Sequence, residues 1–164
     1  MTHAASSEVT QHLERMKRDG YTIVEDVLSP DELAALRDDD DPDAIFEQGA
    51  ARDSTGHSDE AVPRYERALA LGLSGERRRR AVIQMASSLR NLGRAEESVR
   101  LLRAEREAGS DHLDDAVSAF LALALADTGE EREAASLALE ALAPHLPRYQ
   151  RSLGNYAREL RGED

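Results

Sequence analysis

Histidines and carboxylates at metal-ligand spacing are the first residues to consider for chemistry. His57 and Asp59 form an H-x-D pair, and His112 or His145 could nominally supply a third ligand. Two histidines and one carboxylate hold Fe(II) in non-haem oxygenases. His57 and Asp59, however, fall in an expected turn between two helices, where polar capping residues are common. The sequence therefore predicts a turn at this point and no metal site.

Two runs of like charge are the next candidates for binding chemistry. The acidic run Asp38–Asp43 offers oxygen ligands, but it lacks the D-x-D-x-D-G pattern of a calcium loop and is typical of a solvated linker. Arg77–Arg80 is the one basic block in an acidic chain. Four consecutive arginines point around a whole helix, so one or two of them can face a given surface. Pairing with Glu76 or the acidic linker and contact with a partner's carboxylate both stay open.

No pattern typical of an enzyme stands out. The chain has no cysteine, which excludes disulfides, thiolate metal sites and cysteine nucleophiles. Neither a Ser–His–Asp arrangement nor a phosphate-cradling glycine loop is recognisable. We expect a protein that is not an enzyme, with no catalytic residue, no metal and no cofactor.

The charge of the chain is strongly negative and unevenly spread. The formal net charge is −12, with −8 in residues 1–43 and −4 in residues 44–164. Nonspecific binding to nucleic acid depends on basic patches, so we expect no nucleic-acid partner. The longest apolar run, Phe120–Ala126, is far short of the roughly 20 residues that span a bilayer, and the first residues lack the apolar core of a secretory signal. We therefore expect a cytoplasmic protein with no membrane partner, composed of an acidic appendage (1–43) and a separate domain (44–164).

An internal repeat organises that domain. Gly56, Gly93 and Gly129 are separated by 37 and 36 residues and stand in similar sequence surroundings. Glycine tolerates the left-handed backbone that ends a helix, and small residues at fixed offsets let neighbouring helices cross closely. Seven residues before the three glycines stand the small residues Gly49, Ala86 and Ala122. Five residues after them stand the small residues Ala61, Ser98 and Ala134. Nine residues after them stand Tyr65, Leu102 and Ala138.

Helical spacing of apolar residues between these glycines predicts three helix pairs and a last helix. The last helix carries an apolar stripe, as expected of a helix that caps the open end of an array. The predicted helices are 43–54 and 58–72, 76–91 and 95–107, 112–127 and 131–143, and finally 148–161 with the stripe Tyr149, Leu153, Tyr156 and Leu160.

The stretches AVPRYERALALGLSGERRRRAVIQMASSLRNLGRAEESVRLL and FLALALADTGEEREA resemble the tetratricopeptide repeat, in particular a bacterial family known as group 5, over about residues 44–160. The resemblance implies an all-α, right-handed solenoid of three helix pairs plus a C-terminal capping helix. It also implies a non-catalytic scaffold that binds a protein or peptide. Ser118 and Ala138 depart from the pattern where large residues are usual, and Glu105 stands where a small residue is usual.

The resemblance further implies a concave groove lined by the first helix of each pair. Arg80, Ser87, Arg90 and Asn91 would then lie within an arc of about 100° at roughly 3.6 residues per turn and would favour an acidic peptide or carboxylate. The alternative is that Arg80 and Arg90 pair with flanking aspartates and only hold adjacent repeats together. The full set of predicted partner-binding residues is Arg80, Ile83, Ser87, Arg90, Asn91, Asp53 and Asp127.

The N-terminal stretch LERMKRDGYTIVEDVLSPDELAALRD, with the extended segment Tyr21–Glu25, resembles the opening of phytanoyl-CoA dioxygenase-like proteins, which depend on Fe(II) and 2-oxoglutarate. The stretch contains none of that family's catalytic motif. It leaves, as an alternative function, a remnant or accessory fragment of such an oxygenase. Whether residues 1–40 dock on the first helix pair or stay independent is open from the sequence.

Overall fold

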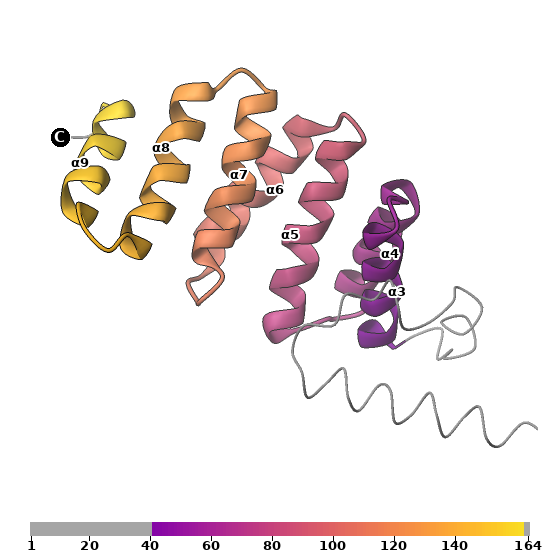
Figure 1. Cartoon of the computed structure of the whole chain (residues 1–164). Helices are drawn as coiled ribbons and strands as arrows, with labels where there is room; N and C mark the ends of the chain where they lie inside the picture. Colours follow the sequence, from indigo (N-terminus) through magenta and orange to yellow (C-terminus); the bar gives the residue numbers. More distant parts are fainter. Residues whose placement is uncertain (1–40, 163–164) are drawn as a thin grey trace, which may run out of the picture.

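A computed structural model of the chain describes residues 41–162 (Figure 1). Within that range it contains seven α-helices, one short 3-10 helix and no strand. The all-helical prediction for the repeat domain is therefore confirmed. The predicted extended segment Tyr21–Glu25 and the acidic residues up to Asp40 lie outside the described residues.

The helices form three consecutive pairs and a last helix, as the glycine spacing predicts, and most ends fall within two residues of the predicted ones. α3 begins two residues before the predicted domain boundary at 44, because the Asp41 carboxylate caps it by accepting the Asp43 amide at 3.0 Å. The elements are α3 (Pro42–Ser54) and α4 (Ser58–Ala70), α5 (Gly75–Asn91) and α6 (Ala95–Ala108), α7 (Asp114–Asp127) and α8 (Glu131–Leu142), then η2 (Ala143–His145) and α9 (Gln150–Leu160).

The three repeat glycines act as helix stops. Gly56, Gly93 and Gly129 have φ values of 80°, 75° and 84°, in the left-handed region that glycine adopts without a side-chain clash. The residue after each glycine donates its amide to the carbonyl five positions back, as in Arg94 to Leu89 at 2.9 Å. This bond closes the end of each first helix and turns the chain into the second.

Small residues at the repeat positions let the helices pack closely. A Cβ on Gly49 would lie 2.9 Å from Cε1 of Tyr65, so only glycine leaves room for that buried ring. Ala86 and Ala122 are 0% and 6% exposed, as predicted for helix crossings. The third repeat departs from the other two: Ala138 is exposed, whereas Tyr65 and its counterpart in the second repeat are fully buried.

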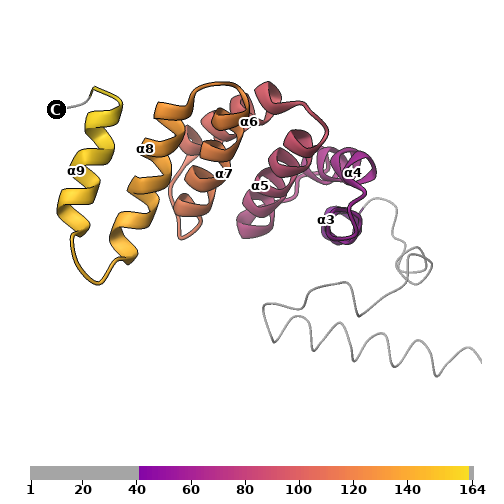
Figure 2. The ribbon, with the colours of Figure 1, turned by 45° about the horizontal axis from the view of Figure 1, so that its top comes forward.

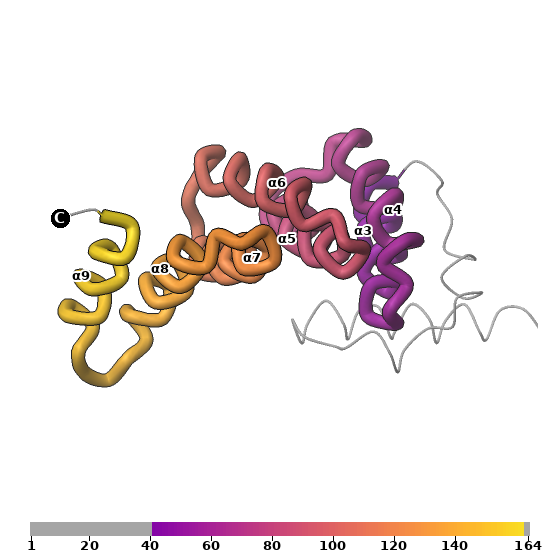
Figure 3. The backbone as a smooth tube through the Cα atoms, turned by 90° about the horizontal axis from the view of Figure 1, so that it is seen from above, coloured from indigo at the N-terminus to yellow at the C-terminus, as the bar shows by residue number. Residues whose placement is uncertain are grey.

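The first helices of successive repeats form one layer of the array. α3 contacts α5 and α5 contacts α7, whereas within residues 41–162 the second helices α4, α6 and α8 show no comparably close packing on one another. A stack whose first helices approach more closely than its second helices must curve, with the first helices on the inside. Figures 2 and 3 show the pairs advancing from α3 and α4 to α9 at the far end. The inner layer is therefore α3, α5 and α7.

Candidate partner-binding surface

Arg80 is the exposed cation of the inner layer. Its guanidinium carbon lies 5.6 Å from the ring centroid of Phe46, which α3 holds fully buried. A guanidinium over an aromatic face gains from the ring quadrupole and keeps its N–H groups available. Within residues 41–162, Arg80 forms no ion pair, unlike the other three arginines of the block.

The other three arginines are structural. Arg77 reaches back to α3, with nitrogens 3.5 Å from Asp43 Oδ1 and 3.6 Å from Glu47 Oε1. Arg78 and Arg79 reach forward instead, and both contact the carboxylate of Glu105 on α6. Three arginines of the block therefore pair with carboxylates of neighbouring helices, and the fourth, Arg80, pairs with none among residues 41–162.

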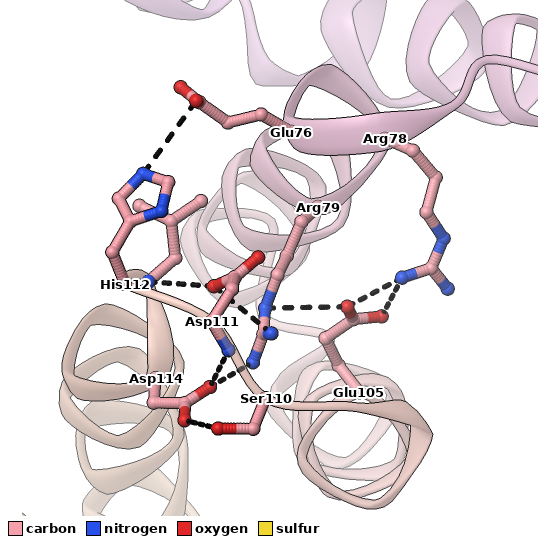
Figure 4. Close-up of polar contacts among 9 residues, drawn as sticks. Glu76, Arg78, Arg79, Glu105, Ser110, Asp111, His112 and Asp114 are labelled. Atoms are coloured by element: carbon pink, nitrogen blue, oxygen red, sulfur yellow. Dashed lines mark hydrogen bonds and ion pairs between the residues drawn. The ribbon is translucent and has the colours of Figure 1, made fainter.

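Arg79 joins the second repeat to the third (Figure 4). Its side chain is 7% exposed and that of Glu105 only 4%, and its nitrogens also lie 3.1 Å from Asp111 and 2.7 Å from Asp114. Hydrogen bonds from the Ser110 hydroxyl and the Asp111 amide, together with Arg79, lower the pKa of Asp114. Glu105 replaces the usual small residue because two arginines neutralise it there.

Arg90 and Asp127 form an ion pair between repeats. Nε of Arg90 lies 2.5 Å from Oδ2 of Asp127, so this ion pair joins α5 to α7. Ser87 is half-buried and Asn91 is exposed, and within the described residues neither side chain forms a hydrogen bond. Ile83 is 6% exposed and belongs to the core beneath this surface.

Asp53 takes part in a polar contact between the first two repeats rather than in an arginine pair. Its carboxylate accepts a hydrogen bond from the Ser88 hydroxyl at 2.6 Å. Burial raises the pKa of Asp53, and burial also raises the pKa of Glu47 although Arg77 and Arg80 oppose the change. The Tyr65 hydroxyl lies beside these carboxylates, and burial and their charges raise its pKa too. The inner face of α3 therefore carries two half-buried acids, Glu47 and Asp53, whose pKa values are raised.

The inner face of α7 is apolar. Leu123 is 46% exposed, and Ala119 and Ala126 are exposed on the same helix. Because Ala119, Leu123 and Ala126 stand at the positions that Ile83, Ser87 and Arg90 hold on α5, they extend the same surface. The inner face thus changes from acidic on α3 through cationic and amide groups on α5 to apolar on α7.

Each of the three histidines within residues 41–162 contacts a different residue. His57 contacts Thr55 at 3.0 Å, His112 lies 3.7 Å from Glu76 and His145 lies 2.8 Å from Asp115. A search of residues 41–162 finds no group of three or more His, Asp or Glu side chains that could hold a metal ion. The same residues include no helix both long and apolar enough to cross a bilayer.

Paired helices stacked with their first members on a shared inner face define a helical-repeat protein. A family model described as "Tetratrico peptide repeat" matches residues 42–160, and the chain belongs to that family. The family indicates a role in protein–protein interaction or scaffolding. No curated protein and no solved structure gives a match to the chain. The oxygenase resemblance of the N-terminal stretch therefore finds no support in these comparisons.

Proposed function

We propose that this protein is a non-catalytic scaffold that holds a segment of a partner protein against the inner face of α3, α5 and α7. The observation that carries the proposal is Arg80, an exposed guanidinium held over Phe46 without an ion pair among the described residues. A partner carboxylate is the complement that such a fork of N–H donors recognises best. The partner segment is therefore acidic at the point where it meets α5.

The neighbouring residues have distinct parts in this proposal. Asn91 and Ser87 offer side-chain hydrogen bonds to the partner, and Leu123 offers an apolar contact on α7. Arg90 lines the surface in a position fixed by Asp127. Ile83 supports the surface from within the core, and Asp53 shapes its α3 edge through Ser88.

The proposal extends to the setting of the protein. The scaffold is of the bacterial type and cytoplasmic, and its net charge of −12 disfavours nucleic acid as a partner. The repeat domain, which begins with α3 at Pro42, binds the partner, while the residues that precede it form a separate appendage. No observation within residues 41–162 favours the oxygenase fragment, which would require the purified protein to bind Fe(II) and 2-oxoglutarate.

Affinity capture followed by mass spectrometry identifies the partner, and one charge reversal tests the surface. We expect Arg80→Glu to abolish capture while leaving helicity unchanged and lowering the melting temperature only slightly, because the contact with Phe46 is lost as well. The matched control is Arg100→Glu, because Arg100 is an exposed arginine on α6 in the outer layer. Capture that survives Arg80→Glu, or that both variants reduce equally, would show that the partner binds elsewhere.

A further inference from the structure

The last helix has the sequence register of a first helix. Ala157 follows Ala122 by 35 residues, close to the 37 and 36 residues that separate the repeat glycines. Ala157 is also fully buried, like the equivalent Ala86. The residues around it in α9, Leu153-x-x-Tyr156-Ala157-x-x-Leu160, correspond to Val82-x-x-Met85-Ala86-x-x-Leu89 in α5. α9 therefore has the register of a first helix, although it packs on α8 and η2 rather than closely on α7.

The side chains of α9 are uncovered where those of α5 are buried. Met85 and Leu89 are 7% and 5% exposed, whereas Tyr156 is 62% exposed. Leu153 and Leu160 are only half-buried. No second helix follows α9 within the described residues to cover these positions. The apolar row Tyr149, Leu153, Tyr156 and Leu160, called the α9 stripe below, thus remains open.

The structure holds α9 and its stripe firmly in place. The buried Ser136 hydroxyl donates to the Ala157 carbonyl at 2.5 Å, and Arg161 reaches Glu140 of α8 at 2.6 Å. Gln150 fixes the preceding loop by donating to the Pro144 and Leu146 carbonyls, each at 2.9 Å.

Tyr149 begins the stripe in an unusual backbone conformation. Its φ is 69°, which makes it the one non-glycine residue with positive φ among residues 41–162, and its side chain is 77% exposed. A bulky residue is disfavoured in the left-handed region, and it keeps that conformation only where the surrounding structure fixes it. Tyr149 immediately precedes the first residue of α9 (Gln150–Leu160), so the stripe extends one residue beyond the helix.

We propose that the α9 stripe binds the α9 stripe of a second copy of this chain, antiparallel and about a twofold axis. The spacing of the stripe is 4, 3 and 4 residues, which reads the same in both directions. A twofold axis therefore brings identical rows into register. Tyr149 lies over Leu160 of the second copy, and Tyr156 lies over its Leu153. In both pairs an exposed aromatic ring covers a leucine that its own chain leaves half open.

Charge along α9 fits this arrangement. Glu159 flanks the stripe near one end, and Arg148, which forms no ion pair within the described residues, precedes it at the other. The antiparallel register places Arg148 of each copy beside Glu159 of the other, so the twofold axis generates two equivalent ion pairs. At 100° per residue, Arg151 and Arg158 lie on the opposite side of the helix, away from the contact.

The size of the surface predicts a weak dimer. Contact between two single helices buries less than about 1,200 Å² of accessible surface, which is the lower limit for a standard stable interface. The dimer should therefore form in proportion to concentration and dissociate on dilution. This inference does not depend on the proposed partner surface, which lies on α3, α5 and α7.

Sedimentation velocity of the full chain over a range of concentrations tests the dimer. We expect a reversible monomer–dimer equilibrium that Tyr156→Asp weakens at least about tenfold, because a central aromatic contact is lost. Tyr156→Phe should keep the equilibrium. Leu92→Asp should keep it too, because Leu92 is a 40% exposed leucine at the end of α5, away from the stripe. Circular dichroism checks that each variant folds.

A charge swap tests the antiparallel register. Arg148→Glu and Glu159→Arg should each weaken the dimer, and the double variant should restore it. A chain that stays monomeric at every concentration, or a dimer that survives Tyr156→Asp, would overturn the proposal. Open oligomers larger than a dimer would overturn the twofold arrangement.

Discussion

The buried tie made by Arg79 gives the sharpest stability prediction. Replacing Arg79 by Met keeps a long side chain but removes the cation that faces Glu105, which is 4% exposed. Breaking a buried ion pair by removing one partner costs about 3–5 kcal/mol, because the other charge is left in a poor solvent. Arg78 still contacts Glu105, and Asp111 and Asp114 are exposed enough to regain water. We therefore expect a cost at or just below the lower end of that range, about 2–3 kcal/mol.

Thermal unfolding followed by circular dichroism measures this cost. A loss of that size lowers Tm by roughly 5–10 °C in a domain of this length. The matched control is Arg80→Met, which removes an exposed cation–π contact and should cost about 1 kcal/mol or less. The double variant Arg79→Met with Glu105→Leu should recover much of the stability, because apolar side chains replace a buried pair at little cost. A loss under about 0.5 kcal/mol for Arg79→Met, or no recovery in the double variant, would refute the buried tie.

Three further changes have expected outcomes. Ala122→Leu should overpack a helix crossing and cost about 1–3 kcal/mol in urea unfolding, and an unchanged midpoint would mean that the repeat register is wrong. The pKa of Asp53 is raised in the folded state, so the folded chain binds this proton more readily than the unfolded chain. Asp53 therefore contributes more to the free energy of unfolding as the pH falls from neutral through the raised pKa toward the ordinary value of 3.8. Unfolding free energies at several pH values should show Asp53→Asn lacking this gain, and parallel profiles for the two proteins would contradict it. Deletion of residues 1–40 should leave helicity and Tm of the repeats unchanged, whereas an insoluble product would favour docking of that segment on the first helix pair.

The repeat architecture follows from local features of the sequence. A glycine in the left-handed region ends each first helix, and small residues at fixed offsets define the crossings, so spacing alone predicts the helices and most of their ends. The third repeat is less regular, and there the same reasoning misplaces one position: Ala138 is exposed, while Leu137 packs into the core. Leu137 is buried in place of Ala138 because the orientation of α8 in the core, and not the repeat spacing, decides which residue faces inward.

The side-chain partners of the arginines could not be predicted in the same way. Arg79 and Arg80 are adjacent and chemically identical, and only the packed structure shows that one is buried against Glu105 and the other exposed over Phe46. The partners lie 26 to 35 residues away from Arg79 in the sequence, on α6 of the same repeat and at the start of the third repeat. Glu105 did give a signal, because an acid stood where a small residue was expected. Asp111 and Asp114 gave none.

Hydroxyl-radical footprinting of the chain with its captured partner tests most directly whether the inner face is the binding surface. Leu123 lies on the inner face of α7 and is 46% exposed, whereas Leu71 lies at the end of α4 and is 40% exposed, so the two leucines are matched probes. The scaffold proposal predicts that partner binding reduces oxidation of Leu123 and leaves oxidation of Leu71 unchanged. Protection of Leu71 with Leu123 still fully reactive would contradict it.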